Sequence, residues 1–339
     1  MKRNFALTTL LIPILLLSIN VKIYHVGEFS LRIKKTVKGI FIIDSLKGSI
    51  YFLHEENERV IRGFLFPLWV DTLGNYLYVT DVKRGYVYKI DLFSFNMVSK
   101  VYVKRPEIEM IKIYKGRIYV SSNNEVYELD KDLRILRKWK FCAKSVYFYF
   151  YEDFLLHMNY WKSKDCPDVT IIDLKSGKVV KNLYLGFERP FRFLSMYDKW
   201  VFLDYKTGDI AFVRNFHIIK RINLPAYSYD IVYYESKIVV SNLFEKSLYI
   251  VDPILYRISK VQLNCQVGDL EVFNDHLFLS CIFDNYVCSM KNWKLEWKIS
   301  CEYPVMMAKD DKGIYLLCAD EGKVKFINMG GKIKGKEGS

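Results

Sequence analysis

The side chains best suited to chemistry in this 339-residue chain are its cysteines and histidines. No two cysteines have the C-x-x-C spacing of zinc, haem-attachment and thioredoxin-like motifs. The five histidines are scattered, without the i,i+2 or i,i+4 pairs that bring metal ligands together. Neither a G-x-S-x-G elbow nor a phosphate-binding glycine loop occurs. The sequence therefore predicts no catalytic residues, no metal site and no cofactor.

The seven cysteines leave several pairings open. Cys281 and Cys288 flank the segment 283–285. If that segment is a hairpin turn, the two lie nearly opposite each other on neighbouring strands and could form a disulfide outside the cytosol. Cys265 and Cys301 occupy equivalent repeat positions, roughly one unit apart. Because the total is odd, at least one thiol stays unpaired, and the alternative is that all seven are buried and reduced.

The elements that carry these residues form a repeat with a period near 40 residues. Strand-like apolar runs recur eight times, 37 to 46 residues apart, at Ile40, Leu77, Ile118, Leu155, Val201, Ile238, Leu277 and Ile314. Each unit has four such runs, and alternation with period two is typical of β-strands. Five of the eight prolines lie between one unit and the next, where no ladder needs an N–H donor. The repeat predicts an all-β propeller with one four-stranded blade per unit.

The best copies of this unit resemble the YVTN-type propeller repeat. The matching segments are 78–81 (YVTD) with 85–92 (GYVYKIDL), 239–242 (VVSN) with 249–252 (YIVD), and 170–174 (TIIDL) with 176–180 (SGKVV). Segments 173–180 and 295–298 are also similar to quinone-type propeller repeats. The resemblance covers about residues 26–330. It implies the propeller fold and no single activity, because such propellers serve many unrelated roles.

Eight units predict eight blades, with seven as the alternative if residues 29–44 serve otherwise. The eighth unit lacks an apolar fourth run, because its C-terminal residues are GGKIKGKEGS. We expect residues 21–26, VKIYHV, to supply that outer strand and so close the ring. The propeller domain then spans residues 21–331, followed by a disordered tail at 332–339.

The N-terminus indicates export. Lys2 and Arg3 precede an apolar run at residues 5–19, the pattern of a secretory signal. The run is shorter than the ~20 residues of a bilayer-spanning helix, and no clean small-x-small cleavage site follows it. Residues 1–20 are therefore either a signal peptide or an N-terminal membrane anchor. We expect an extracytoplasmic protein, at the cell surface or tethered to a membrane through residues 5–19.

Charge and aromatic content point to a binding surface. The chain carries a formal charge of +13 and is 16% aromatic, which favours anionic ligands. In propellers, loops between second and third strands share one face with the connections between blades. On that face we expect charge-assisted hydrogen bonds and stacking from Arg84, Arg105, Trp161, Arg189, Arg192, Lys206 and Tyr229. The alternative is that these residues belong to ordinary polar loops of a basic protein.

Taken together, these features predict an exported, non-catalytic and monomeric binding or scaffold module. Its ligand would be a protein or an anionic or glycan partner of the cell envelope. The alternative is a propeller enzyme of the lyase or quinone-dependent dehydrogenase type. Similarity to quinone-type repeats does not imply catalytic activity, because non-catalytic assembly factors of the outer membrane share the same kind of repeat. Charge and aromatics would also suit a nucleic-acid binder, but export argues against one.

Overall fold

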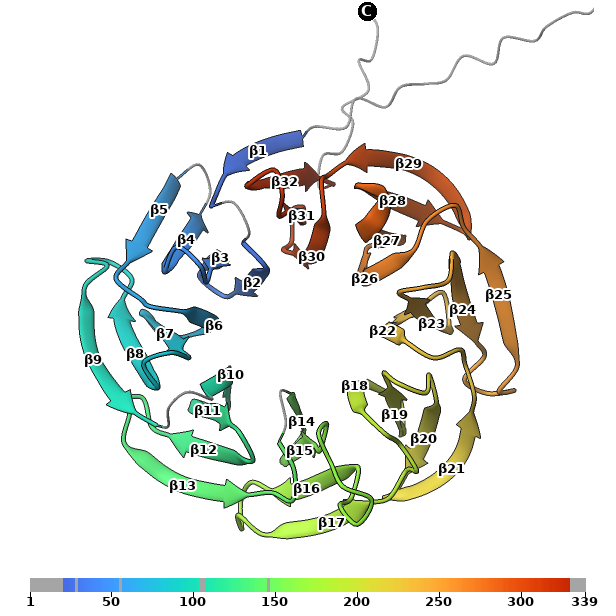
Figure 1. The fold of residues 1–339 in the computed structure, drawn as a ribbon, viewed down its shortest axis with the longest axis horizontal. Coiled ribbons are helices and arrows are strands. Elements are labelled where there is room, and N and C mark those ends of the chain that lie inside the picture. Colours follow the sequence, from blue (N-terminus) through green and yellow to red (C-terminus); the bar gives the residue numbers. More distant parts are fainter. Residues whose placement is uncertain (1–20, 28–29, 55–56, 104–107, 145–146, 330–339) are drawn as a thin grey trace, which may run out of the picture.

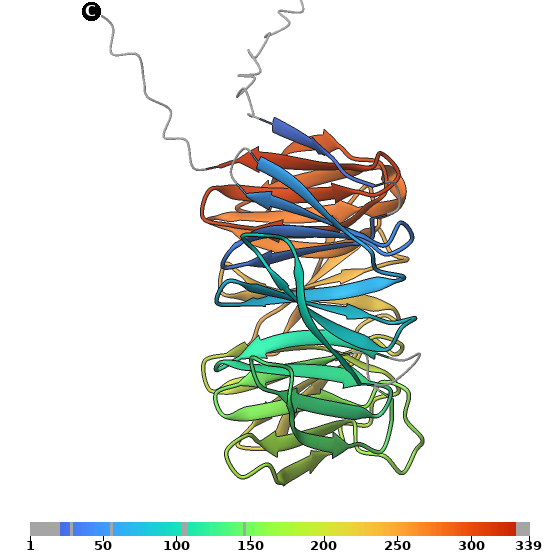
Figure 2. The same cartoon turned by 90° about the vertical axis from the view of Figure 1, so that its left-hand side faces the viewer.

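The computed structural model describes residues 21–27, 30–54, 57–103, 108–144 and 147–329. It shows eight four-stranded antiparallel sheets arranged as the blades of a propeller (Figure 1). Seen from its edge, the ring is a disc in which neighbouring blades pack side by side (Figure 2). The eight-bladed prediction is confirmed, and the seven-bladed alternative is wrong. The predicted signal or anchor at residues 1–20 and the predicted tail at 332–339 lie outside the described residues.

The first four blades each run outward from an innermost strand that faces the axis of the ring. Blade 1 comprises β2 (Arg32–Thr36), β3 (Gly39–Asp44), β4 (Ser49–His54) and β5 (Asn57–Arg62). Blade 2 comprises β6 (Pro67–Leu73), β7 (Tyr76–Asp81), β8 (Tyr86–Asp91) and β9 (Met97–Tyr102). Blade 3 comprises β10 (Ile108–Tyr114), β11 (Arg117–Ser122), β12 (Glu125–Leu129) and β13 (Ile135–Lys140). Blade 4 comprises β14 (Phe148–Tyr151), β15 (Phe154–Met158), β16 (Val169–Asp173) and β17 (Val179–Leu183).

The next three blades follow the same order. Blade 5 comprises β18 (Pro190–Met196), β19 (Lys199–Asp204), β20 (Ile210–Arg214) and β21 (His217–Ile222). Blade 6 comprises β22 (Ser228–Tyr234), β23 (Lys237–Asn242), β24 (Ser247–Val251) and β25 (Ile258–Gln262). Blade 7 comprises β26 (Val267–Phe273), β27 (His276–Cys281), β28 (Tyr286–Lys291) and β29 (Lys294–Ser300), with the short helix η1 (Ile282–Asp284) between β27 and β28.

Blade 8 takes its outer strand from the other end of the chain. It combines β30 (Pro304–Lys309), β31 (Gly313–Cys318) and β32 (Lys323–Asn328) with β1 (Val21–His25). β1 pairs antiparallel with β32, from Val21 opposite Ile327 to His25 opposite Lys323. The predicted closure by the N-terminal strand is confirmed. It follows from the sequence, because residues 21–26 alternate and the C-terminal decapeptide offers almost nothing apolar to bury.

Burial follows position in the blade. The second and third strands are buried on both faces because neighbouring blades cover both sides of each sheet. In β7, for example, Leu77, Tyr78 and Val79 are completely buried. The outer strands are largely exposed, as the pattern of β13 shows.

In blades 2, 5 and 6, a polar side chain at the end of the second strand holds the connector that enters the blade. Asp81 accepts hydrogen bonds from the backbone N–H groups of Leu65 (2.8 Å) and Phe66 (3.1 Å). Asp204 does the same for Glu188 and Arg189. In blade 6, the amide of Asn242 donates to the carbonyl of Ala226 at 2.8 Å. We call these three completely buried residues the polar connector clamps.

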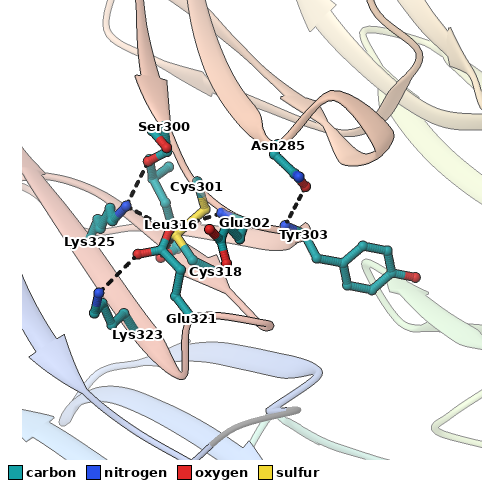
Figure 3. Close-up of a disulfide and its surroundings, with 10 residues drawn as sticks. All are labelled: Asn285, Ser300, Cys301, Glu302, Tyr303, Leu316, Cys318, Glu321, Lys323 and Lys325. Atoms are coloured by element: carbon teal, nitrogen blue, oxygen red, sulfur yellow. Dashed lines mark hydrogen bonds and ion pairs between the residues drawn. A yellow bond between two sulfur atoms is a disulfide. The ribbon is translucent and has the colours of Figure 1, made fainter.

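In blades 7 and 8 a disulfide occupies the equivalent position. Cys281 and Cys318, which like the polar clamps pair with the first residue of the innermost strand, bond to Cys265 and Cys301 of the connectors. Figure 3 shows the second of these disulfides beside Glu321, whose carboxylate accepts the N–H of Glu302 at 2.9 Å. A third disulfide, Cys142–Cys166, joins the connector entering blade 4 to the loop between β15 and β16 of that blade.

The Cys281–Cys288 pairing that the sequence left open does not form, and neither does the alternative of seven reduced cysteines. Cys288 pairs across the ladder with Leu279 instead of Cys281, and its sulfur lies 3.9 Å from that of Cys281. The connector packs against the end of β27 and brings Cys265 to Cys281 instead. The expected unpaired thiol is Cys288, which is buried.

Candidate binding site on the loop face

An axial pocket of about 470 Å³ opens on the side of the ring where the connectors and the loops between second and third strands meet. We call this side the loop face. Its walls combine loop residues such as Leu46 and Phe283 with residues near the start of innermost strands. The latter include Arg32, Trp69 and Arg192 from blades 1, 2 and 5. A single pocket thus gathers side chains from distant parts of the sequence.

Bulges at the start of the innermost strands set the positions of several pocket residues. The ladder slips between the first residues of β6, β22 and β26 and their partners. At each slip, a hydroxyl on the second strand accepts a backbone N–H from the first. The pairs are Trp69 to Thr80 (3.1 Å), Asp230 to Ser241 (3.0 Å) and Asp269 to Ser280 (2.7 Å). The hydroxyl of the YVTD-like motif therefore fixes a bulge, a common way to redirect side chains.

Two carboxylates near the axis tie neighbouring blades together. Asp230 accepts the N–H of Leu270 at 3.0 Å, and Asp269 accepts the N–H of Met307 at 2.8 Å. Burial, followed by the nearby Asp230 carboxylate, holds the pKa of Asp269 well above its usual value. Asp269 therefore carries less negative charge than an exposed aspartate at the same pH.

Arg192 is the paired cation of the axial pocket. Its guanidinium lies 3.0 Å from the Asp230 carboxylate and 4.4 Å from the centre of the Phe191 ring. The ring of Tyr229 lies on another side, at 5.4 Å. Burial alone would lower the pKa of Arg192, but the Asp230 carboxylate and nearby tyrosines outweigh it and raise that pKa. Arg192 is thus charged and balanced by a carboxylate.

Arg32 is a second cation in the pocket, and sequence reasoning missed it. Its guanidinium stacks on the indole of Trp69, 4.3 Å from the ring centre. Burial lowers its pKa, although arginine stays charged at neutral pH. Arg32 lies at the start of β2, a position like those of the predicted residues Arg192 in β18 and Tyr229 in β22. A usable signal was present, because charged residues recur two apart in first runs, as in Arg32 with Lys34 and Asp269 with Glu271.

An aromatic belt extends from the pocket across blades 4, 5 and 6. Its rings touch in series, with centre-to-centre distances of 4.9 to 6.3 Å. The belt consists of Tyr160, Trp161, Phe191, Tyr205, Tyr227, Tyr229 and Phe244. Arg189 lies over the Trp161 ring at 4.3 Å. Rings in edge-to-face and tilted contact, with an arginine over one of them, form a rigid surface that can contact a ligand at low entropic cost.

The predicted site residues fall into several places. Arg192 and Tyr229 line the axial pocket, while Trp161 and Arg189 meet at the end of the aromatic belt. Lys206 forms an ion pair with Glu188. Arg84 lies apart, donating to the carbonyl of Gly63 at 2.6 Å. Arg105 lies outside the described residues.

The histidines and cysteines of the described residues lie outside the axial pocket and the aromatic belt. Among the described residues, the one cluster of three potential metal ligands is Cys265, Cys281 and Cys288, of which the first two form a disulfide. His157 is fully buried, stacks on Phe141 and interacts with Asn159 at 3.1 Å. Burial lowers the pKa of His157 to about 3, so this imidazole is neutral.

One buried lysine has an unusual titration. Lys112 on β10 donates to the carbonyl of Phe148 at 2.9 Å and lies over the Tyr149 ring. Burial, together with the nearby Lys34, lowers the pKa of Lys112 to about 7. No described carboxylate forms an ion pair with it, so its charge changes around neutral pH.

Solved structures share the fold of this chain at low sequence identity. BamB from Moraxella catarrhalis has a TM-score of 0.74 at 9% identity, covering 91% of this chain and 98% of its own. Sqt1 from Saccharomyces cerevisiae has a TM-score of 0.74 at 13% identity, covering 90% and 97%. Virginiamycin B lyase from Staphylococcus aureus has a TM-score of 0.59 at 11% identity, covering 78% and 94%. At such identities the likeness establishes the fold alone.

Sequence comparisons add no family. No family model matches the chain, and no curated protein matches it either. The resemblance to the YVTN repeat is therefore not confirmed as family membership, while the eight-bladed propeller is. Among the described residues, no helix is long and apolar enough to cross a membrane.

Proposed function

We propose that this protein is an exported, non-catalytic propeller that binds a protein partner on its loop face. The observation that carries the proposal is a set of exposed, large apolar side chains on the loop face, four of which (Leu31, Leu46, Phe283 and Tyr303) line the axial pocket. These side chains are 37 to 66% exposed and comprise Leu31, Leu46, Leu65, Phe244, Phe283 and Tyr303. Apolar groups that gather around a pocket on an otherwise charged protein mark an interaction site.

The mixture of side chains favours a polypeptide over a glycan. Tyrosine, tryptophan and arginine, as found in the aromatic belt, are enriched at protein interfaces. Glycans also stack on aromatic rings, but exposed leucines such as Leu31, Leu46 and Leu65 give their hydroxyls no partner. The formal charge of +13 adds attraction for an acidic partner.

Two features support export. The charged and apolar pattern of residues 1–20 matches a secretory signal. Six of the seven cysteines pair as disulfides, which persist mainly outside the cytosol. Both features agree with a protein that works at the cell envelope, whether the signal is cleaved or retained as a membrane anchor.

One observation favours the enzyme alternative. Asp269 lines the pocket with a raised pKa, and perturbed carboxylates gather at catalytic sites. However, Asp269 and Asp230 both accept backbone N–H groups of the neighbouring blade, which explains their burial as structural. We therefore favour binding over lyase or dehydrogenase chemistry.

Matched phenylalanines on the two faces of the ring provide the test. Phe283 lies in η1 on the loop face and is 59% exposed, whereas Phe93 lies in the opposite turn between β8 and β9 and is 73% exposed. Purified protein would be used to capture partners from an envelope extract of the source cells. We expect Phe283→Ser to lose the partner and Phe93→Ser to retain it. Equal capture by both variants would refute a loop-face site.

Export is tested separately by cell fractionation and by the mass of the mature N-terminus. We expect the protein in the envelope or outside the cell. A purely cytosolic protein with intact residues 1–20 and reduced cysteines would refute this part of the proposal.

A further inference from the structure

The axial pocket contains a cation, Arg32, that forms no ion pair with any described carboxylate. Within the part of the chain that the structure describes, the guanidinium of Arg32 makes neither an ion pair nor a hydrogen bond. Its contact is the face of Trp69. The nearby carboxylate of Glu109 is already paired with Lys144 at 3.2 Å. The N–H donors of Arg32, which lines the pocket, therefore have no hydrogen-bond partner among the described residues.

The other charges of the pocket do not compensate for Arg32. Arg192 and Asp230 form a neutral pair at 3.0 Å. Asp269, the remaining carboxylate of the lining, accepts a hydrogen bond from the N–H of Met307. Arg32 is therefore the pocket cation without an ion pair among the described residues. An unpaired charge in a partly desolvated site favours a ligand of opposite sign.

The walls around Arg32 limit what can carry that negative charge. The lining includes Leu68 and Met306 beside Phe66, and the rim is formed by exposed Leu46 and Phe283. A volume of about 470 Å³ lies within the ~300–1,000 Å³ typical of ligand pockets, so a few side chains fit. Phosphate-rich or heavily hydroxylated ligands would leave polar groups unpaired against these apolar walls.

We infer that the axial pocket binds a carboxylate of a partner polypeptide, flanked by apolar residues, with Arg32 as its bidentate donor. The carboxylate is either an acidic side chain or a free C-terminus, since both present the same two oxygens. Planar arginine matches this geometry better than lysine does. Stacking on Trp69 holds the guanidinium plane in place before the ligand arrives, which reduces the ordering cost of binding.

This inference rests on the proposed loop-face function and names the chemistry of its partner. It is tested with three fluorescently labelled apolar hexapeptides that have the same core sequence. The first has a free C-terminal carboxylate, the second an internal glutamate and an amidated C-terminus, and the third a glutamine and an amidated C-terminus. Fluorescence anisotropy gives the Kd of each for the full-length protein.

We expect one or both acidic peptides to bind at least tenfold more tightly than the neutral peptide. The peptide that binds identifies the source of the carboxylate. Arg32→Gln should remove this preference, and Arg32→Lys should restore only part of it. Arg84→Gln is the matched control, because Arg84 is an exposed loop-face arginine outside the pocket lining. Circular dichroism and thermal melting establish that each variant is folded.

Three outcomes of the peptide measurements would overturn the inference. They are equal binding of acidic and neutral peptides, no binding of any peptide at millimolar concentration, and an acidic preference that survives in folded Arg32→Gln protein. Binding of a polyanionic glycan through Arg32, with no peptide binding, would also overturn it. If Phe283→Ser loses the captured partner while Arg32→Gln keeps it, the carboxylate inference fails and the proposed function stands.

Discussion

Blades 2, 5 and 6 hold their incoming connectors with buried polar side chains, whereas blades 7 and 8 use disulfides at the equivalent position. A polar clamp works only if every buried oxygen and N–H finds its partner. A disulfide needs no such partner but depends on an oxidising environment. The same structural requirement, a connector fixed against the end of the second strand, is thus met by two unrelated chemistries.

The distribution of the two chemistries follows the closure of the ring. Blade 8 is completed by β1, which is not continuous with the other three strands of that blade. Its sheet is therefore held to β1 by hydrogen bonds and packing alone. The disulfides of blades 7 and 8 reinforce this side of the ring, where a loose connector would favour opening.

The largest effect is expected from removing the blade 8 disulfide. Cys301→Ser with Cys318→Ser releases a cross-link that spans 17 residues, which should lower the free energy of unfolding by about 3 kcal/mol. Urea unfolding followed by circular dichroism measures this change. Cys288→Ala, which removes the unpaired thiol, is the control and should cost about 1 kcal/mol or less. An unchanged urea midpoint in the double variant would mean that this disulfide is dispensable.

Removing a polar clamp should have the next largest effect. Asp204→Ala leaves four backbone N–H groups without their acceptor, those of Glu188, Arg189, Lys206 and Thr207. We expect a loss of about 2 to 3 kcal/mol, because unsatisfied buried donors are costly. The additional effect of a reductant should be the same in wild type and Asp204→Ala, in contrast to the cysteine variant. A reductant-dependent cost of Asp204→Ala would mean that the two kinds of clamp are coupled.

Lowering the pH should destabilise the protein through His157, a buried histidine of blade 4. His157 takes the place of Val79 in the second strand of blade 2, and its pKa is lowered to about 3 by burial. Below pH 6.5 the His157 imidazole is protonated in the unfolded chain but stays neutral in the folded protein. The free energy of unfolding therefore falls as the pH drops. The loss is about 2 kcal/mol at pH 5, from 1.36 kcal/mol for each pH unit. Urea midpoints of His157→Gln should fall less between pH 7 and pH 5 than those of wild type, and parallel decreases would exclude this group.

The smallest net change in stability is expected from replacing the polar connector clamp of blade 6 with a disulfide. Ala226 and Asn242 are 16 residues apart, as are Cys265 and Cys281. Ala226→Cys with Asn242→Cys, in a Cys288→Ala background, should form a disulfide and stay within about 1 kcal/mol of that background when oxidised. Mass spectrometry after alkylation without reduction counts free thiols. Two alkylated cysteines would show that the positions are not geometrically equivalent.

The repeat made most of the fold predictable. Period-two runs in units of about 40 residues define eight blades, and the alternation of residues 21–26 indicates the closing strand. These features are local, because each run carries its own burial pattern regardless of its neighbours. The residues of the candidate site were harder to predict from the sequence. Arg192, Tyr229 and Arg32 all lie near the start of innermost strands, but the prediction considered only the first two of them.

The sequence alone predicted the order of strands, the closing strand and eight blades with seven as the alternative, since hydrophobic periodicity dictates which residues must be buried. Only the tertiary structure decided which cysteines pair and which cations meet. Cys288 is near Cys281 in sequence but lies opposite Leu279 in the ladder. Packing of the connector brings Cys265 to Cys281, and these two form the disulfide. Arg32 and Arg192 are brought to one pocket by closure of the ring from blades 1 and 5. Contacts of this kind depend on distances across the ring, which no local pattern encodes.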